Sequence, residues 1–307
     1  VMILTGLILM QMIPYEYKGA SLIQSMRLAE EQATKTEVKK FKPLSASDQA
    51  RSRLGIIRER GILRVGYNDN TMPYAFTNKK DELVGLDVEI LNALANDLDL
   101  QIQYTLIEDI SDEPQLLSEG SVDIIIGGKA ITPNRALDSA FSNKYTHHTA
   151  GFIVGDARRD EFSSMEKINA MKSLTLGVPG SVYYKNSIQK ILPQAKLVLI
   201  DDPVKYFSGE YKEVNAFVTS SEAGSAWTLL YPKYTAVVPK GLKLKAPIGF
   251  KLPKGQPDYL QYINTWLELK KENGYLQNVY EYWILGKNPK QKVPRWSVIR
   301  VVLGWHR

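Results

Sequence analysis

The chain has 307 residues, of which 44% are apolar and 23% charged, so it can form one large or two medium globular domains and is not intrinsically disordered. It has no cysteine, which excludes disulfides and thiolate chemistry, and its three histidines have no metal-ligand spacing with a partner. The net charge of +6 is too small and dispersed to indicate nucleic-acid binding. We expect no metal site and no nucleic-acid partner, and no motif indicates a cofactor.

The first segment, Val1–Ile13, is apolar apart from Thr5 and Gln11. It is too short to span a bilayer, which takes about 20 residues. No basic residues precede it, as they would in a secretory signal. We interpret residues 1–17 as the truncated remnant of a transmembrane helix; a short buried helix is the alternative. Residues 18–60 are predicted to be a helical connector, broken at Pro43 and ending before Gly61.

Strand and helix patterns then alternate, and the order is β-α-β-α-β. This alternation favours a mostly parallel sheet with helices on both faces. Strands are predicted at Ile62–Tyr67, Gln101–Leu106 and Val122–Ile126, and helices at Val88–Leu98 and Pro114–Ser118.

A second unit repeats the same order after the charged stretch Asp156–Met165. Residues 61–155 and 245–286 are therefore assigned to lobe 1 and residues 156–244 to lobe 2. The chain crosses between them near Val154 and near Ala246. Residues 287–307 are predicted to be a polar tail with one short amphipathic helix, which packs on the domain or lies at a membrane surface.

The stretch Ser121–Arg135 (SVDIIIGGKAITPNR) carries the main functional signal. A buried strand is followed by Gly127 and Gly128, which permit a tight turn. Thr132 and Pro133 fit the N-cap and first residue of a helix. Free amides and the helix dipole favour an anion there, and the Arg135 guanidinium can hold a carboxylate through two hydrogen bonds. The alternative is an ordinary strand–helix connection with a solvated arginine.

Several blocks together resemble the polar amino acid family of bacterial extracellular solute-binding proteins, over about Ile57–Gly286. They are GILRVGYN from Gly61, MPYAF from Met72, LVGLDVE from Leu83, GGKAITPNR from Gly127 and FSNKY from Phe141. The resemblance implies an α/β fold of the type II periplasmic-binding-protein kind. Such a fold has two lobes and a hinged cleft, here preceded by an N-terminal helical, membrane-proximal segment.

The same resemblance implies the ligand-binding residues. Arg135 would hold a ligand carboxylate, assisted by the backbone of Gly128 and Ala130 and by the Thr132 hydroxyl. Tyr74 and Phe76 would cover the body of the ligand, or they are core residues. From lobe 2 would come Ser181, in the GVPGS motif, and the turn Ser220–Glu222.

Two departures from the family pattern affect the choice of ligand. Ala130 stands where the pattern usually has Ser or Thr, and Ser220 stands where it has the acid that meets an amino acid's ammonium group. A buried ammonium group without an anionic partner is costly. Either Glu222 replaces that acid, or the ligand is an organic acid without an ammonium group; the residues lean slightly away from a standard α-amino acid.

The predicted function is therefore extracytoplasmic binding of a small anionic metabolite for membrane transport, without catalysis. The N-terminal apolar segment and RWSVIR (Arg295–Arg300) resemble binding domains fused to cation:dicarboxylate symporters. The partner would be a membrane transporter, either separate or in the same polypeptide, and the protein would be anchored to the inner membrane through its N-terminus. The alternatives are the sensory ectodomain of a receptor and a dehydratase-type enzyme, for which Glu222 is the one candidate acid or base.

Overall fold

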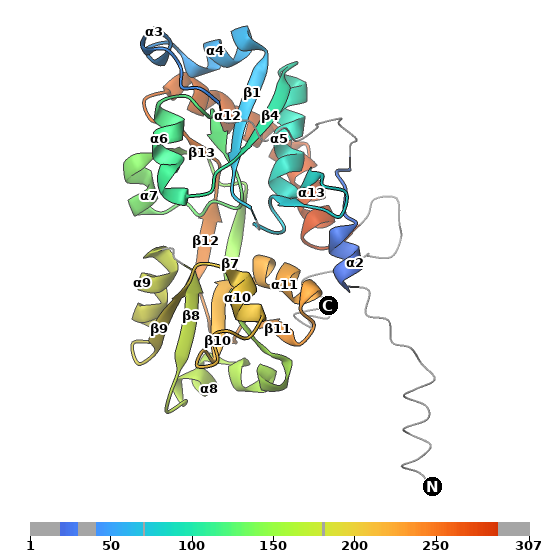
Figure 1. Ribbon diagram of the computed structural model, residues 1–307, viewed down its shortest axis with the longest axis vertical. Helices are drawn as coiled ribbons and strands as arrows, with labels where there is room; N and C mark the ends of the chain where they lie inside the picture. The colour runs from blue at the N-terminus through green and yellow to red at the C-terminus, as the bar shows by residue number, and fades with distance from the viewer. Residues whose placement is uncertain (1–18, 30–40, 70, 180–181, 288–307) are drawn as a thin grey trace.

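The computed structural model describes residues 19–29, 41–69, 71–179 and 182–287, arranged as two lobes stacked end to end (Figure 1). The apolar segment Val1–Ile13, the tail helix expected within residues 287–307 and Ser181 lie outside the described residues. Within the described part of the chain, none of the helices is both long and apolar enough to cross a bilayer.

The sheet of lobe 1 has the strand order β4-β1-β5-β13-β6. Its first three strands are parallel, but β13 runs antiparallel to both β5 and β6. The sheet is therefore mixed rather than mostly parallel, because the chain re-enters it in the opposite direction after lobe 2. The strands are β1 Ile62–Tyr67, β4 Gln101–Leu106, β5 Ile124–Ile125, β6 Ala140–Phe141 and β13 Lys251–Leu252.

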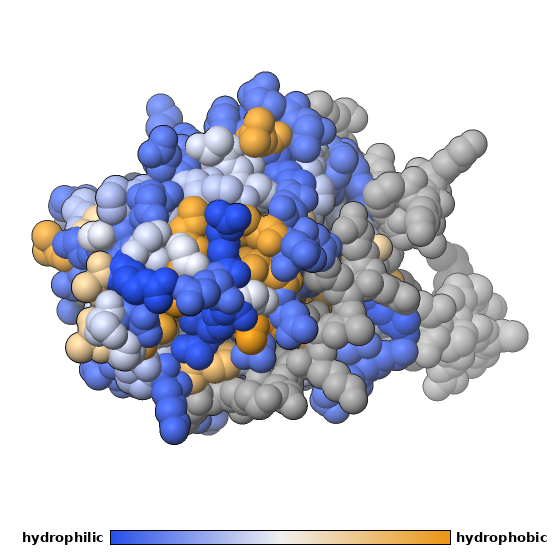
Figure 2. Space-filling model, turned by 90° about the horizontal axis from the view of Figure 1, so that it is seen from above, coloured by the Kyte–Doolittle hydropathy of each residue, from blue (hydrophilic) through white to orange (hydrophobic). Residues whose placement is uncertain are grey.

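Helices surround this sheet, and the hairpin β2 (Phe76–Thr77) and β3 (Leu83–Val84) lies beside it. Seen from above, the lobe-1 end shows apolar side chains in the middle of a mainly polar face (Figure 2). The helices are α5 Leu86–Asp97, the 3-10 turn η1 Ile110–Asp112, α6 Glu113–Ser118, α7 Pro133–Asp138, α12 Pro257–Glu272 and α13 Tyr275–Trp283.

The sheet of lobe 2 has the order β11-β7-β10-β8-β9 and is also mixed. Strands β8, β9 and β10 are parallel, whereas β7 is antiparallel to β10 and β11. Its elements are η2 Asp156–Phe162, α8 Met165–Asn169, β8 Thr175–Pro179, α9 Val182–Ile191, β9 Lys196–Ile200, α10 Pro203–Phe207, β10 Ala216–Ser220, α11 Ser221–Leu230 and β11 Tyr234–Val237.

Two strands cross between the lobes. The first half of β7 (Thr146–Gly155) pairs with β12 (Lys245–Ile248), and its second half pairs with β10 and β11 of lobe 2. Because β7 belongs to the crossing and to the lobe-2 sheet, it places side chains at the junction of the two lobes (Figure 1).

The connector forms three short helices within the described residues: α2 Gly19–Gln24, α3 Ala46–Gln49 and α4 Arg53–Arg60. Where the sequence predicted one helix after Pro43, Ser45 and Ser52 cap two separate ones. α4 ends at Gly61, whose φ of 67° is the left-handed conformation that glycine adopts without strain.

Candidate functional site

The glycine turn after β5 is held by a carboxylate of the protein itself. The N–H groups of Gly127 and Gly128 donate to Asp87 Oδ2 at 2.8 and 2.9 Å, and the Tyr145 hydroxyl donates to Oδ1 at 2.6 Å. The Gly128 amide, which the sequence assigned to a ligand anion, is thus already engaged. Burial raises the pKa of Asp87 to about 6, although these three donors favour its charged form.

Arg135 lies half-buried in the first turn of α7, as the sequence predicted for its helix. Thr132 caps this helix by accepting from the Arg135 N–H at 3.3 Å. The guanidinium donates through Nη1 to the carbonyl of Ala130 at 3.1 Å. Ala130 itself is buried and bridges to Ile248 of β12. The guanidinium therefore folds back toward the crossing strands.

The rings of Tyr74 and His148 pack together beside the glycine turn. The Tyr74 ring covers Gly128 so closely that a Cβ at that glycine would lie 2.8 Å from it. The ring of His148, on β7, lies 5.0 Å from the Tyr74 ring between centroids. His148 Nε2 is buried and has no hydrogen-bond partner among the described residues. Burial, with the Arg135 charge adding to it, lowers the pKa of His148 to about 3, so the imidazole is neutral at physiological pH.

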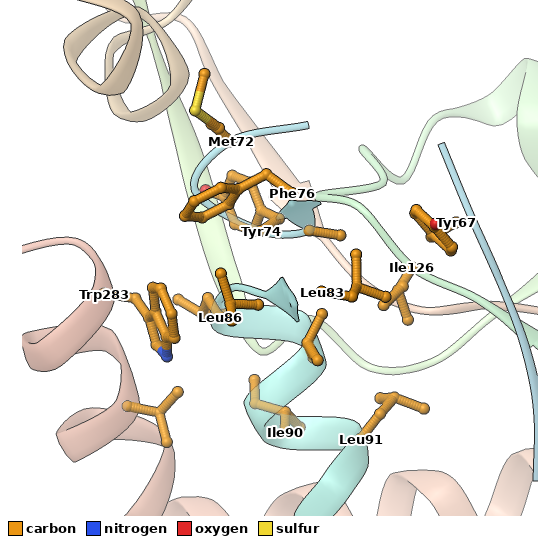
Figure 3. Packing of buried hydrophobic residues seen from close by; sticks show 14 of the residues in the cluster. Tyr67, Met72, Tyr74, Phe76, Leu83, Leu86, Ile90, Leu91, Ile126 and Trp283 are labelled. Atoms are coloured by element: carbon orange, nitrogen blue, oxygen red, sulfur yellow. The ribbon is translucent and has the colours of Figure 1, made fainter. Parts of the chain in front are cut away.

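Phe76 occupies a different environment from the one predicted for a ligand contact. It is 4% exposed and packs edge-to-face on Trp283, at 6.1 Å between ring centroids. Figure 3 shows it within a buried apolar cluster that also holds Leu83 and Leu86. These contacts fit the core-residue alternative for Phe76.

Lobe 2 contributes the first turn of α11. Ser220 is its N-cap and accepts from the Ala223 N–H at 3.0 Å. The Glu222 carboxylate accepts from the Thr149 N–H at 3.2 and 3.3 Å. Burial raises the pKa of Glu222 to about 7. Glu222 is therefore bonded to β7 at the residue that follows His148.

A buried ion network lies behind the glycine turn. Lys129 Nζ donates to Asn68 Oδ1 and to Glu113 Oε1, the latter at 2.5 Å, and Lys251 Nζ donates to Glu113 Oε2 at 2.9 Å. Burial opposes ionisation of Glu113, but the two ammonium groups outweigh it and lower its pKa. Two cations share one carboxylate here, which leaves an excess positive charge close to Arg135.

Sequence reasoning missed three residues of this site: Asp87, Tyr145 and His148. Asp87 is an acid immediately before the predicted helix Val88–Leu98, and that position could have suggested a partner for backbone amides. His148 gave no signal, because only the pairing of β7 with β12 turns it toward Arg135. Among the described residues no group of three or more side chains is arranged to hold a metal ion.

Known proteins match this architecture over most of the chain. The model of the bacterial extracellular solute-binding proteins, family 3, matches residues 63–286. Cyclohexadienyl dehydratase of Pseudomonas aeruginosa is 24% identical over 248 residues, 78% of this chain and 89% of that protein. The glutamine-binding protein GlnH of an ABC transporter in Bacillus subtilis is 22% identical over 249 residues, 78% of this chain and 87% of that protein.

A solved structure shares this two-lobe fold. The ancestral amino acid-binding protein AncCDT-1, a precursor of cyclohexadienyl dehydratase, superposes with a TM-score of 0.65 at 26% identity. The match covers 76% of this chain and 99% of that one. Because the family model covers more than half of the chain and the fold agrees, this chain belongs to family 3 of the bacterial extracellular solute-binding proteins.

Proposed function

We propose that this protein is an extracytoplasmic receptor that binds a small carboxylate-bearing metabolite between its lobes and delivers it for membrane transport. The proposal is supported by two observations at the crossing strand β7: the Arg135 charge acts on the buried ring of His148, and Glu222 accepts from the N–H of the next residue, Thr149. These residues offer a cation, a neutral hydrogen-bonding group and an acid at the junction of two lobes.

Arg135 is the proposed partner of the ligand carboxylate. Its guanidinium donates to the Ala130 carbonyl at 3.1 Å, and the planar fork of a guanidinium can hold a carboxylate through two parallel hydrogen bonds. The excess positive charge of Lys129 and Lys251 over Glu113 adds to the attraction for an anion. Since Asp87 engages the glycine-turn amides, we assign less of the carboxylate binding to Gly128 than to Arg135 and Thr132.

Glu222 is the proposed partner of a ligand ammonium group. It replaces the acid that Ser220 cannot supply, and it is buried beside the crossing with a pKa raised to about 7. A cation beside it would favour its charged form and strengthen binding. This favours an amino acid over a simple organic acid, in keeping with relatives named for arginine, cystine and glutamine.

The remaining parts of the proposal concern location and delivery. Relatives include the arginine-binding periplasmic protein of Mannheimia haemolytica, which is 25% identical over 224 residues. We propose the same compartment here, with the apolar segment Val1–Ile13 as a membrane tether and Ser181 as a further lobe-2 contact. The transporter is either a separate membrane protein or a symporter in the same polypeptide.

The test combines a ligand screen with one substitution. Thermal shifts would be measured with L-arginine, L-glutamine, L-cystine, L-glutamate and succinate, because a ligand of the folded state raises its unfolding temperature. For each compound that binds, Arg135→Ala is expected to weaken binding by about 2 kcal/mol or more in titration calorimetry. Arg51→Ala, which removes an exposed arginine of the connector, should leave the affinity unchanged.

Unchanged affinity in Arg135→Ala would contradict the carboxylate assignment. Failure of all five compounds to stabilise the protein would contradict the proposed ligand class.

One observation favours a second function. The P. aeruginosa relative is a dehydratase, and Glu222, with its pKa near neutrality, is suited to proton transfer. A dehydratase would release water from a cyclohexadienyl substrate repeatedly, and Glu222→Gln would abolish turnover. A receptor would bind at most one molecule of that compound per chain and would form no product.

A further inference from the structure

A segment that precedes lobe 1 lies across both lobes. Helix α2 packs against α11 of lobe 2, and Figure 1 shows it beside α11 and α13. Ile23 and Met26 are fully buried, each with an exposed fraction of 0%. They belong to the apolar cluster that contains Trp227 of α11 and Trp283 of α13. The segment therefore contributes apolar side chains to both halves of the molecule.

The end of the same segment is hydrogen-bonded to lobe 1. Its bonds run to the β2–β3 turn, to α5 and to α13. The Lys79 N–H donates to the Gln24 carbonyl at 2.9 Å, Asn78 Nδ2 to the Met26 carbonyl at 3.0 Å, the Tyr282 hydroxyl to the Arg27 carbonyl at 2.8 Å, and the Ala29 N–H to the Glu89 carboxylate at 2.9 and 3.1 Å.

The two helices beneath this segment both begin at the candidate site. The first turn of α5 contains Asp87, which holds the glycine turn, and Glu89, which accepts from the Ala29 N–H. The first turn of α11 contains Glu222. A change in the angle between the lobes moves these helices apart, and residues 19–29 are attached to both.

We propose that residues 19–29 form a strap that holds the two lobes in their present orientation and limits how far they separate. Opening the cleft must either pull α2 from α11 and expose Ile23, or break the hydrogen bonds of residues 24–29 to lobe 1. Exposing a buried apolar side chain costs free energy, so the strap favours the orientation seen here. This goes beyond the proposed ligand recognition and can be tested without any ligand.

The test measures an inter-lobe distance in the ligand-free, full 307-residue chain. Because the chain has no cysteine, spin labels can be attached at Gln261→Cys on α12 of lobe 1 and Lys190→Cys on α9 of lobe 2, both exposed. Ile23→Asp is expected to shift the distance distribution measured by pulsed electron resonance to longer or broader values. Ser25→Asp adds the same charge at an exposed position of the strap and should leave it unchanged.

A second variant covers the case in which Ile23→Asp does not fold, as judged by circular dichroism. Met26→Ala combined with Tyr282→Phe shortens one buried side chain and removes one hydrogen bond, and should shift the distribution in the same direction by less. A distribution identical to that of the parent chain in a folded strap variant overturns the proposal. Loss of ligand binding in other variants has no bearing on this distance.

Discussion

At the scale of single residues, the junction of the lobes holds ionisable groups whose pKa values burial shifts toward the neutral form. Burial raises the pKa of Asp87 to about 6 and that of Glu222 to about 7, and lowers that of His148 to about 3. Asp87 stays mainly ionised at neutral pH, held by its three hydrogen-bond donors, whereas the His148 imidazole is neutral there. A charged ligand would change this balance, which is why the site should respond to pH.

Glu222 gives a direct test of this reasoning. Its folded-state pKa of about 7 lies above the ordinary value of 4.5, so its ionisation opposes folding, by about 3 kcal/mol at pH values above 7. The stabilising effect of its protonated form is present at low pH and is lost as the pH rises from about 4.5 to about 7. Glu222→Gln should therefore gain unfolding temperature relative to the parent chain between about pH 5 and about pH 8.

Glu268→Gln, on the exposed side of α12, is the control for this measurement. A temperature difference between Glu222→Gln and the parent chain that does not change with pH would show that the carboxylate ionises without cost.

At the scale of elements, the connector is fixed to lobe 1 by a buried cluster of charges. Asp123, with an exposed fraction of 0%, contacts the guanidinium of Arg60 and accepts from the Arg64 N–H at 2.9 Å. The Arg53 guanidinium lies 3.6 Å away and also donates to the carbonyls of Leu117 and Val122. One carboxylate, immediately before β5, thus ties helix α4 to β1.

Asp123→Asn removes the charge that these arginines share. It should lower the free energy of unfolding by about 3 kcal/mol, because it leaves buried cations without an anion. Urea denaturation measures this loss. Glu59→Gln breaks the exposed pair with Arg51 and should cost less than about 1 kcal/mol. Equal effects of the two substitutions would mean that the buried cluster does not anchor α4.

The elements also show which sequence signals are reliable. The bounds of β1 and β4 agree with those predicted, because the apolar spacing of a strand is a local property. The mixed sheet was not foreseen, since strand direction depends on where the chain returns from lobe 2. The same limit applies to the length of β7, which is extended by pairing with β12.

At the scale of the whole molecule, strands β7 and β12 and the strap join the two lobes. These connections lead us to expect one cooperative unfolding transition rather than two. Far-UV circular dichroism follows both lobes, whereas tryptophan fluorescence of a Trp227→Phe variant no longer includes the lobe-2 residue Trp227. The two urea midpoints of this variant should coincide, as in a two-state transition; separate midpoints would mean that the lobes unfold independently.

The sequence by itself determined the family, the order of most elements and the helix that carries Arg135, because these depend on local spacing, caps and motif order. Only the tertiary structure decided what surrounds that arginine. The Asp87 carboxylate, on α5, accepts from the amides of the glycine turn. Phe76 packs in the core against Trp283, and the His148 ring lies beside that of Tyr74. These contacts join residues far apart in the chain, and burial, which shifts the pKa of Glu222 and His148, is a property of the packed lobes.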